Sequence, residues 1–288
     1  MTARGITATD RLMLAYLAAN SAIVVWHAGR TPAWAWLLGA NALTVALVAL
    51  LARTGTKQRF SAFVGGAYPV LLTTAYYTQL GVLGTGVARY HDAVVQRWEL
   101  AVFGSQVSMT WHQAVPSLAL SWIMHLAYWA YYPIVAGALV VLWVRADADA
   151  FARGGFIITL AFYVCYLIFA LFPVMGPRHF FGDATGPIAE ILPARLMRST
   201  QHSGSAMGTA FPSSHVTACW CAVYALWRDA RRLALWLAPV AVVLAFGTVY
   251  GQFHYGVDAL AGAALALVLF PLADPLRTAL GRGDSRSS

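Results

Sequence analysis

Residues 233–274 read LALWLAPVAVVLAFGTVYGQFHYGVDALAGAALALVLFPLAD, which is two long apolar runs joined by a tight turn around Gly251. Each run has about the 20 residues that a helix needs to cross a bilayer. The second run contains Asp258, the only one of the eleven acidic residues that falls inside an apolar run. An ionisable group in such a run is costly, so we treat Asp258 as a candidate functional residue.

The same apolar character extends along the chain. Of the 288 residues, 60% are hydrophobic and only 10% are charged, whereas soluble proteins carry about 25% charged residues. We predict an all-α, polytopic membrane helix bundle of about six to eight spans. The candidate spans are 11–28, 33–52, 60–83, 116–144, 155–174, 213–227, 233–250 and 254–274.

We expect a single integral membrane domain over residues 1–280, with its candidate motifs in 171–274, and a disordered tail at 281–288. The N-terminal apolar stretch resembles a signal peptide, but it is long and has no convincing cleavage site. We therefore interpret it as an uncleaved first span. The three cysteines, Cys165, Cys219 and Cys221, lie in apolar runs and read as small buried residues.

Basic residues are distributed unevenly between the two sides of the membrane. With a cytoplasmic N-terminus, 13 of the 19 lysines and arginines fall in cytoplasmic segments and 6 on the outer side. Because basic residues favour the cytoplasmic side, we predict a plasma (inner) membrane protein with both termini in the cytoplasm. This bias accounts for the net charge of +8 without a nucleic-acid partner, so the expected partners are the bilayer and a lipid.

Two stretches are predicted to lie at the outer face without crossing the membrane. Residues 88–112 place Val94, Val95, Trp98 and other apolar residues at helical spacing among charged ones, which predicts an interfacial helix. The loop 175–212 is long for a connector, and such loops are usually functional.

Two histidines stand at the outer edges of apolar runs. His215 opens the run at 213–227, and His254 precedes Asp258 by four residues. On a helix, His254 and Asp258 would share one face, roughly 6 Å apart along the axis. The carboxylate would then hold the imidazole in one tautomer and raise its basicity, and histidine can act as nucleophile, acid or base. The alternatives are a structural contact between helices for Asp258 and an incidental residue at a helix cap for His215.

Several residues near these histidines are suited to bind an anion. Ser213 and Ser214 stand at the predicted start of a helix, where exposed N–H groups attract anions. Arg178 follows Gly176 and Pro177 and is either a phosphate ligand or an arginine that reaches to the interface. Auxiliary candidates, each also readable as an ordinary loop residue, are His179, Arg195, Arg198 and His202. No cluster of carboxylates or cysteines suggests a metal site, and we expect no cofactor.

These segments resemble the type 2 phosphatidic acid phosphatase superfamily, whose motifs are Lys-x6-Arg-Pro, Pro-Ser-Gly-His and Ser-Arg-x5-His-x3-Asp. Arg178 matches the first motif, residues 212–215 match the second, and His254 and Asp258 match the third. The resemblance implies that His254 attacks phosphorus and becomes a phosphohistidine, that Asp258 orients it, and that His215 protonates the leaving oxygen. It implies phosphoryl-binding roles for Arg178, Ser213 and Ser214.

The chain also departs from these motifs. Leu171 stands at the place of the first lysine, His179 at that of the proline, and Gly247 and Thr248 at those of the third-motif serine and arginine. The remaining pattern is similar to the branch related to inositol phosphorylceramide synthases, as are Asp92 and the Phe103–Gly104 pair. The missing cations would have to be replaced from the loop by Arg195, Arg198, His179 or His202.

We therefore expect a metal-independent membrane enzyme that acts on a lipid phosphate or phosphodiester at the outer face, with lipid phosphatase as the first interpretation. The first alternative is a phosphotransferase that moves a phospho-head group to a lipid or inositol-type alcohol. The second is a non-enzymatic lipid or anion binder or transporter, although we find none of the inverted repeats common in transporters.

Overall fold

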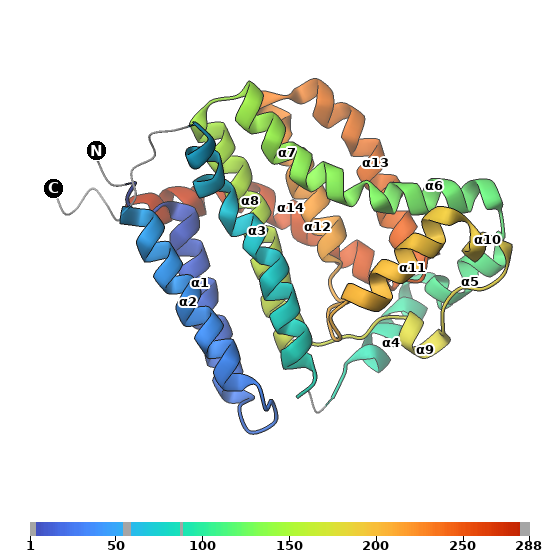
Figure 1. Cartoon of the computed structure of the whole chain (residues 1–288). Helices are drawn as coiled ribbons and strands as arrows, with labels where there is room; N and C mark the ends of the chain where they lie inside the picture. Colours follow the sequence, from blue (N-terminus) through green and yellow to red (C-terminus); the bar gives the residue numbers. More distant parts are fainter. Residues whose placement is uncertain (1–3, 54–58, 87–88, 283–288) are drawn as a thin grey trace.

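The computed structural model describes residues 4–53, 59–86 and 89–282, which fold as helices and loops with one isolated β-bridge between Val174 and Thr209. The predicted all-α class is confirmed. Lys57 and Arg286 of the orientation count, and most of the predicted tail, lie outside the described residues. The helices (Figure 1) are α1 (Ala8–Trp26), α2 (Trp34–Arg53), α3 (Arg59–Gly84), α4 (Asp92–Phe103), α5 (Val107–Ala114), α6 (Leu118–Trp129), α7 (Tyr131–Arg145), α8 (Ala148–Leu171), α9 (Arg178–Phe181), α10 (Pro187–Glu190), α11 (Leu192–Gly204), α12 (Ser214–Asp229), α13 (Arg231–Tyr250) and α14 (Gly256–Gly281).

Five helical stretches in the described part of the chain are long and apolar enough to cross a membrane: α2, α6 together with α7, α8, α13 and α14. This is a polytopic membrane protein. The other three predicted spans coincide with α1, α3 and α12. Helix α12 has 16 residues, or about 24 Å, which is shorter than the hydrocarbon core of roughly 30 Å. It packs against α7, α8, α13 and α14, so protein covers most of its surface.

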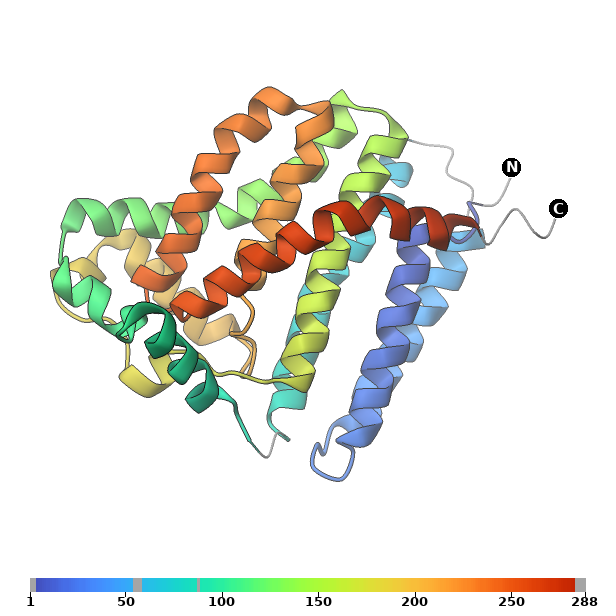
Figure 2. The same cartoon turned by 180° about the vertical axis from the view of Figure 1, so that it is seen from behind.

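Helix α8 is the centre of the bundle. After Arg153 its residues are mostly apolar on all faces, and it packs against α1, α3, α7, α12 and α14. A helix that is hydrophobic all round is one that other helices enclose. Figure 2 shows α14 crossing α8 toward α1, so the last helix ties the N-terminal helices to the rest of the molecule.

The predicted span 116–144 is two helices, α6 and α7, which meet at an angle near Ala130. Pro133 lies in the first turn of α7 and has no N–H to donate to the carbonyl of Trp129, so the helix cannot continue unchanged through this point. The bend turns α6 against α11 and α13, while α7 packs on α8 and α12.

The two stretches predicted to lie at the outer face both contain short helices. The predicted interfacial helix 88–112 is two helices, α4 and α5, because Gly104 ends α4 with a φ of 72°. The loop 175–212 contains α9, α10 and α11. Figure 1 places α4, α9 and α11 near one another, close to the start of α12.

The contact between α6 and α13 depends on Gly247. A Cβ on Gly247 would overlap the carbonyl oxygen of Met124, and backbone cannot move aside as a flexible side chain can. We predict that Gly247→Ala lowers the free energy of unfolding by about 1–3 kcal/mol, a typical cost of overpacking. Thermal unfolding of the purified protein in detergent measures the change. Gly137→Ala in α7 is the matched control, because a Cβ there meets nothing within 4 Å; equal melting temperatures for the two variants would contradict the prediction.

Candidate active site

His254 lies in the turn between α13 and α14. The backbone N–H groups of Phe253 and His254 both donate to the Thr248 carbonyl, at 2.9 and 3.0 Å. Tyr255 is the N-cap of α14, and the helix begins at Gly256. The expectation that His254 and Asp258 share a helical face is therefore wrong, since His254 precedes the helix.

The capping of α14 nevertheless brings Asp258 to His254. Asp258 is fully buried, and its Oδ2 accepts a hydrogen bond of 2.8 Å from the Tyr255 N–H. The same oxygen lies 3.4 Å from Nδ1 of His254. The Asp258 carbonyl accepts from the Ser213 N–H at 3.0 Å. Asp258 thus caps its own helix, faces the imidazole and joins the start of α12 to the start of α14.

The proton of the His254 ring is placed on Nδ1. This nitrogen lies 2.9 Å from the Ala210 carbonyl oxygen, closer than it lies to Asp258. Because a carbonyl oxygen only accepts, Nδ1 is the donor, and Nε2 keeps a free lone pair. That lone pair is what a nucleophilic histidine requires.

His215 is the second residue of α12, next to His254. The predicted helix start is present: Ser213 is the N-cap, and its hydroxyl accepts from the Val216 N–H at 3.5 Å. The rings of His215 and His254 have centroids 5.7 Å apart. Rings in this arrangement are in edge-to-face contact, so one tetrahedral group could lie beside both rings but not between them.

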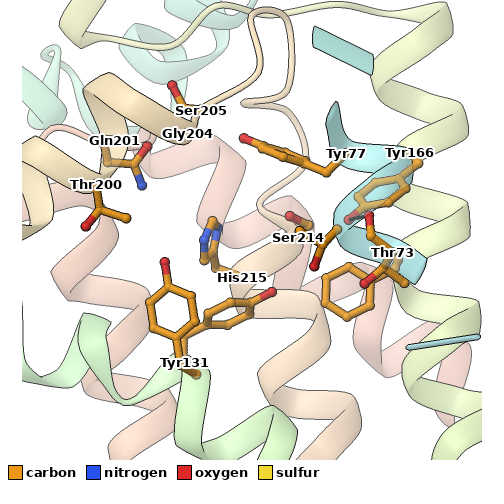
Figure 3. Close-up of a pocket in the computed structure, with 13 residues that line it drawn as sticks. Thr73, Tyr77, Tyr131, Tyr166, Thr200, Gln201, Gly204, Ser205, Ser214 and His215 are labelled. Carbon is orange, nitrogen blue, oxygen red and sulfur yellow. Dashed lines mark hydrogen bonds between the residues drawn. The ribbon is translucent and has the colours of Figure 1, made fainter. Parts of the chain in front are cut away.

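His215 and Ser214 open onto a cavity of about 200 Å³. Figure 3 shows His215 between Thr200 and Gln201 on one side and Thr73, Tyr77 and Tyr166 on the other. Among the described lining residues, none carries a fixed charge. The polar surface of this cavity consists mainly of hydroxyl and amide groups.

Arg178 begins α9 and is held by α11. One terminal nitrogen, Nη2, donates to the Ser205 hydroxyl and, at 3.3 Å, to the Gln201 carbonyl. The other, Nη1, is buried and has no hydrogen-bond partner among the described residues. Nη1 is therefore a free donor, as expected of a residue that binds an anion.

Tyr128 links α11 to His215. Its hydroxyl accepts from the Gln201 side chain at 2.8 Å and lies 3.3 Å from Nε2 of His215. Its ring stacks on Phe253 and is fully buried. Tyr128 lies in the predicted span 116–144, where an aromatic residue is expected only to pack. No pattern in the sequence distinguishes it from Tyr131 and Tyr132.

The auxiliary anion candidates are mostly engaged elsewhere. Arg198 donates to the carbonyls of Ala184 and Ala189, at 3.1 and 2.8 Å, and His202 lies 2.8 Å from Asp183. Burial and the neighbouring guanidinium of Arg178 lower the pKa of His179, which keeps it neutral near pH 7. Arg195 is exposed on α11. Neither these four residues nor Arg178 lines the cavity beside His215, and Arg178 and Arg198 line a separate, smaller hollow.

The departures from the motifs have structural counterparts. Leu171, at the place of the lysine, is 69% exposed at the end of α8. Gly247 lets α6 and α13 approach, and buried Thr248 holds the turn before His254 through its carbonyl. At the two positions where the motifs have a lysine and an arginine, this chain thus has the exposed Leu171 and the buried Thr248.

Two buried carboxylates on α4 fix the surrounding loops. Asp92 accepts from the N–H groups of Met175 and Gly176, both at 2.9 Å, and from the Tyr255 hydroxyl at 3.2 Å. Glu99 accepts from the N–H groups of Val257 at 3.0 Å and Ser108 at 3.2 Å.

Both acids lie in the stretch 88–112, for which the sequence predicts an interfacial helix and not this buried role. The available signal was that they share one face of α4 with Val95, at the spacing i, i+3 and i+7. All three side chains are at most 1% exposed. Helix α4 therefore binds the segment before Arg178 and the segment after His254.

The fold and this arrangement define a helical membrane protein with paired histidines at one end of its bundle. A family model described as the PAP2 superfamily matches residues 94–272, more than half of the chain. The chain belongs to the PAP2 superfamily, whose members are generally phosphatases and phosphotransferases of the lipid phosphate type. The superfamily predicted from the motifs is confirmed. Comparison with curated proteins found no match, and neither did comparison with solved structures.

We predict that Asp92→Ala lowers kcat/KM at least about tenfold, equivalent to 1.4 kcal/mol. The substitution leaves two buried N–H groups without an acceptor beside the segment that carries Arg178, at about 1–3 kcal/mol each. Asp92→Asn keeps one acceptor oxygen and should recover part of the loss. Steady-state assays of purified protein test this, with Asp274→Ala, an exposed acid on α14, as control. Wild-type kcat/KM in Asp92→Ala would show that α4 does not position the loop.

Proposed function

We propose that this protein hydrolyses or transfers a lipid phosphate or phosphodiester through a phosphohistidine at His254, and that lipid phosphatase is its first activity. The observation that carries this proposal is the state of the His254 ring. Nδ1 is held by the Ala210 carbonyl and faces Asp258, which leaves Nε2 free. His215, with its ring centroid 5.7 Å away, is within reach of a phosphoryl group bound beside the two rings.

In the first step, Nε2 of His254 attacks phosphorus in line and forms the N–P bond. The bond from phosphorus to the leaving oxygen breaks, and this oxygen keeps the electron pair and takes a proton from His215. Asp258 stabilises the positive charge that develops on the His254 ring.

The phosphoryl oxygens carry negative charge throughout the reaction. Nη1 of Arg178, the Ser214 hydroxyl and the N–H groups at the start of α12 are suited to stabilise it. Ser213 contributes mainly as the cap that begins this helix. Preorganised donors of this kind act without having to reorient during the reaction.

In the second step, His215 accepts a proton from water or from an alcohol, whose oxygen attacks phosphorus. The N–P bond breaks and its electron pair returns to Nε2 of His254, which restores the starting state. Water makes the enzyme a phosphatase, and an alcohol makes it a transferase.

The phosphotransferase alternative has support in the cavity beside His215. Hydroxyl groups of Thr73, Tyr77, Tyr166 and Ser205 line it, and no described lining residue has a fixed charge. Such a lining suits an uncharged alcohol. This supports the narrower kinship with the branch related to inositol phosphorylceramide synthases.

Several broader expectations form part of the proposal. The bias of basic residues supports a plasma (inner) membrane location with both termini in the cytoplasm and the histidines on the extracytoplasmic side. The contacts of α14 with α1, α8 and α12 support a single domain. The substrate would reach the site from the surrounding bilayer.

We predict that His254→Ala abolishes turnover and that His215→Ala lowers it by about 10²–10⁴-fold, the usual contribution of a general acid and base. Wild-type protein incubated with labelled lipid phosphate should carry acid-labile phosphate, and His254→Ala should carry none. Quantifying inorganic phosphate and new phospholipid by mass spectrometry separates phosphatase from transferase.

These assays contain EDTA, so that a contaminating metal-dependent phosphatase does not contribute. Retained turnover in purified His254→Ala would overturn the mechanism. Bound lipid phosphate with neither turnover nor phosphohistidine in wild type would instead favour a non-enzymatic binder or transporter.

We further predict that Tyr128→Phe slows hydrolysis of an alkyl phosphate about tenfold, because the Tyr128 hydroxyl orients the His215 ring. It should leave the burst of nitrophenol released from p-nitrophenyl phosphate, which reports the first step alone, nearly unchanged, because nitrophenolate departs without a proton. Tyr224→Phe, on the same helix as His215 but stacked on Phe270, is the control. An equal loss of the first-step rate with both substrates would assign Tyr128 a purely structural role.

A further inference from the structure

A second cavity, of about 490 Å³, lies at the end of the bundle where α1 and α8 terminate. Four side chains that are basic or can become so line it: His27 and Arg30 follow α1, and Arg89 and His91 precede α4. The rest of the described lining is apolar, and no acidic side chain is part of it. The residues of this cavity are separate from those of the cavity beside His215.

Backbone contacts hold the two basic pairs close together. A Cβ on Gly86, in the turn after α3, would overlap the Thr31 hydroxyl and lie 2.8 Å from the Arg30 carbonyl oxygen. The loop after α1 therefore packs directly on the turn after α3. On the other side, the His91 N–H donates to the Pro173 carbonyl at 2.9 Å, and its ring stacks on Phe172.

The charges in this cavity have no counterpart in the described structure. Neither Arg30 nor Arg89 forms an ion pair with any residue of the described ranges. Nδ1 of His27 is buried and has no hydrogen-bond partner there. Asp92, next to His91, is turned away and bound to backbone N–H groups. Two unpaired guanidinium groups beside one hollow favour an anion with several oxygens, such as a phosphate.

The apolar part of the cavity indicates where this phosphate comes from. Trp26 and Leu171 contribute to the wall and are 84% and 69% exposed. They stand at the ends of α1 and α8, where tryptophan commonly marks the membrane interface. A free phosphate makes no use of this surface, whereas a lipid places its phosphate among the basic groups and its chains along α1 and α8. The volume lies within the range of about 300–1,000 Å³ usual for ligand pockets.

We propose that this cavity binds the phosphate of an anionic bilayer phospholipid and is distinct from the site at His254. The cavity thus serves as a non-catalytic lipid site. This proposal does not depend on the reaction at His254, because none of its four basic residues takes part in that mechanism.

The test is lipid binding to the purified full-length protein, measured by native mass spectrometry. Phosphatidylglycerol is titrated against wild type, the double variant Arg30→Gln/Arg89→Gln and the matched control Arg97→Gln. Arg97 is an exposed arginine on α4 that does not line the cavity. We expect the double variant to bind at least about tenfold more weakly and Arg97→Gln to bind as wild type does. Phosphatidylcholine should bind all three weakly. Lipid bound at the catalytic site contributes equally in all three proteins. The difference in phosphatidylglycerol affinity between them therefore reports binding at this cavity.

Inorganic phosphate and glycerol phosphate are added as competitors. If neither competitor displaces phosphatidylglycerol, the result supports a lipid site. Complete displacement by inorganic phosphate would overturn the proposal. Equal affinity of the double variant and wild type would also overturn the proposal. The single variants Arg30→Glu and Arg89→Glu provide a second measurement. Each charge reversal should weaken binding more than the neutral glutamine substitution at the same position does.

Discussion

A carboxylate at the start of a membrane helix has to find its partners within the protein, and the site is arranged around this constraint at Asp258. Its side chain caps α14 through the Tyr255 N–H and faces the imidazole of His254. Its carbonyl receives the Ser213 N–H, so the start of α12 is fixed relative to the start of α14. His215 comes from α12 and His254 from the turn before α14, and Asp258 helps to fix their separation. Because Asp258 is fully buried, bulk solvent cannot readily replace a lost partner, which makes the arrangement rigid.

The supply of positive charge distinguishes this site from the motifs it resembles. Within the described ranges no fixed cation lines the cavity beside His215, and Arg178 contacts two of its lining residues, Gln201 and Ser205. Neutral hydroxyl and amide groups make up most of the polar lining of the cavity beside His215. Oriented hydroxyl and amide dipoles can also stabilise an anion, and they do so more strongly where the local dielectric is low. They also bind an uncharged alcohol, which a ring of cations would not favour.

Much of the fold followed from apolar run length and from caps, as the helices at 233–250 and 254–274 and the Ser213 N-cap illustrate. Other features were not predictable from local pattern. Pro133 breaks one predicted span into two helices, and His254 sits in a turn because the Tyr255 cap begins α14 later than the apolar run suggests. The roles of Asp92 and Tyr128 were missed for a different reason. An amphipathic or apolar pattern shows that a face is covered, but it does not show whether lipid or a catalytic loop covers it.

Helix α4 sets a distance as well as making contacts. Asp92 and Glu99 are seven residues apart, or about 10 Å along the axis, and they bind chain segments that lie more than 80 residues from one another. The loops around them can change in length without altering this spacing. One residue inserted between the two acids would rotate Glu99 by about 100° around the helix. The precise length of a short helix outside the membrane spans therefore determines whether the two halves of the site face each other.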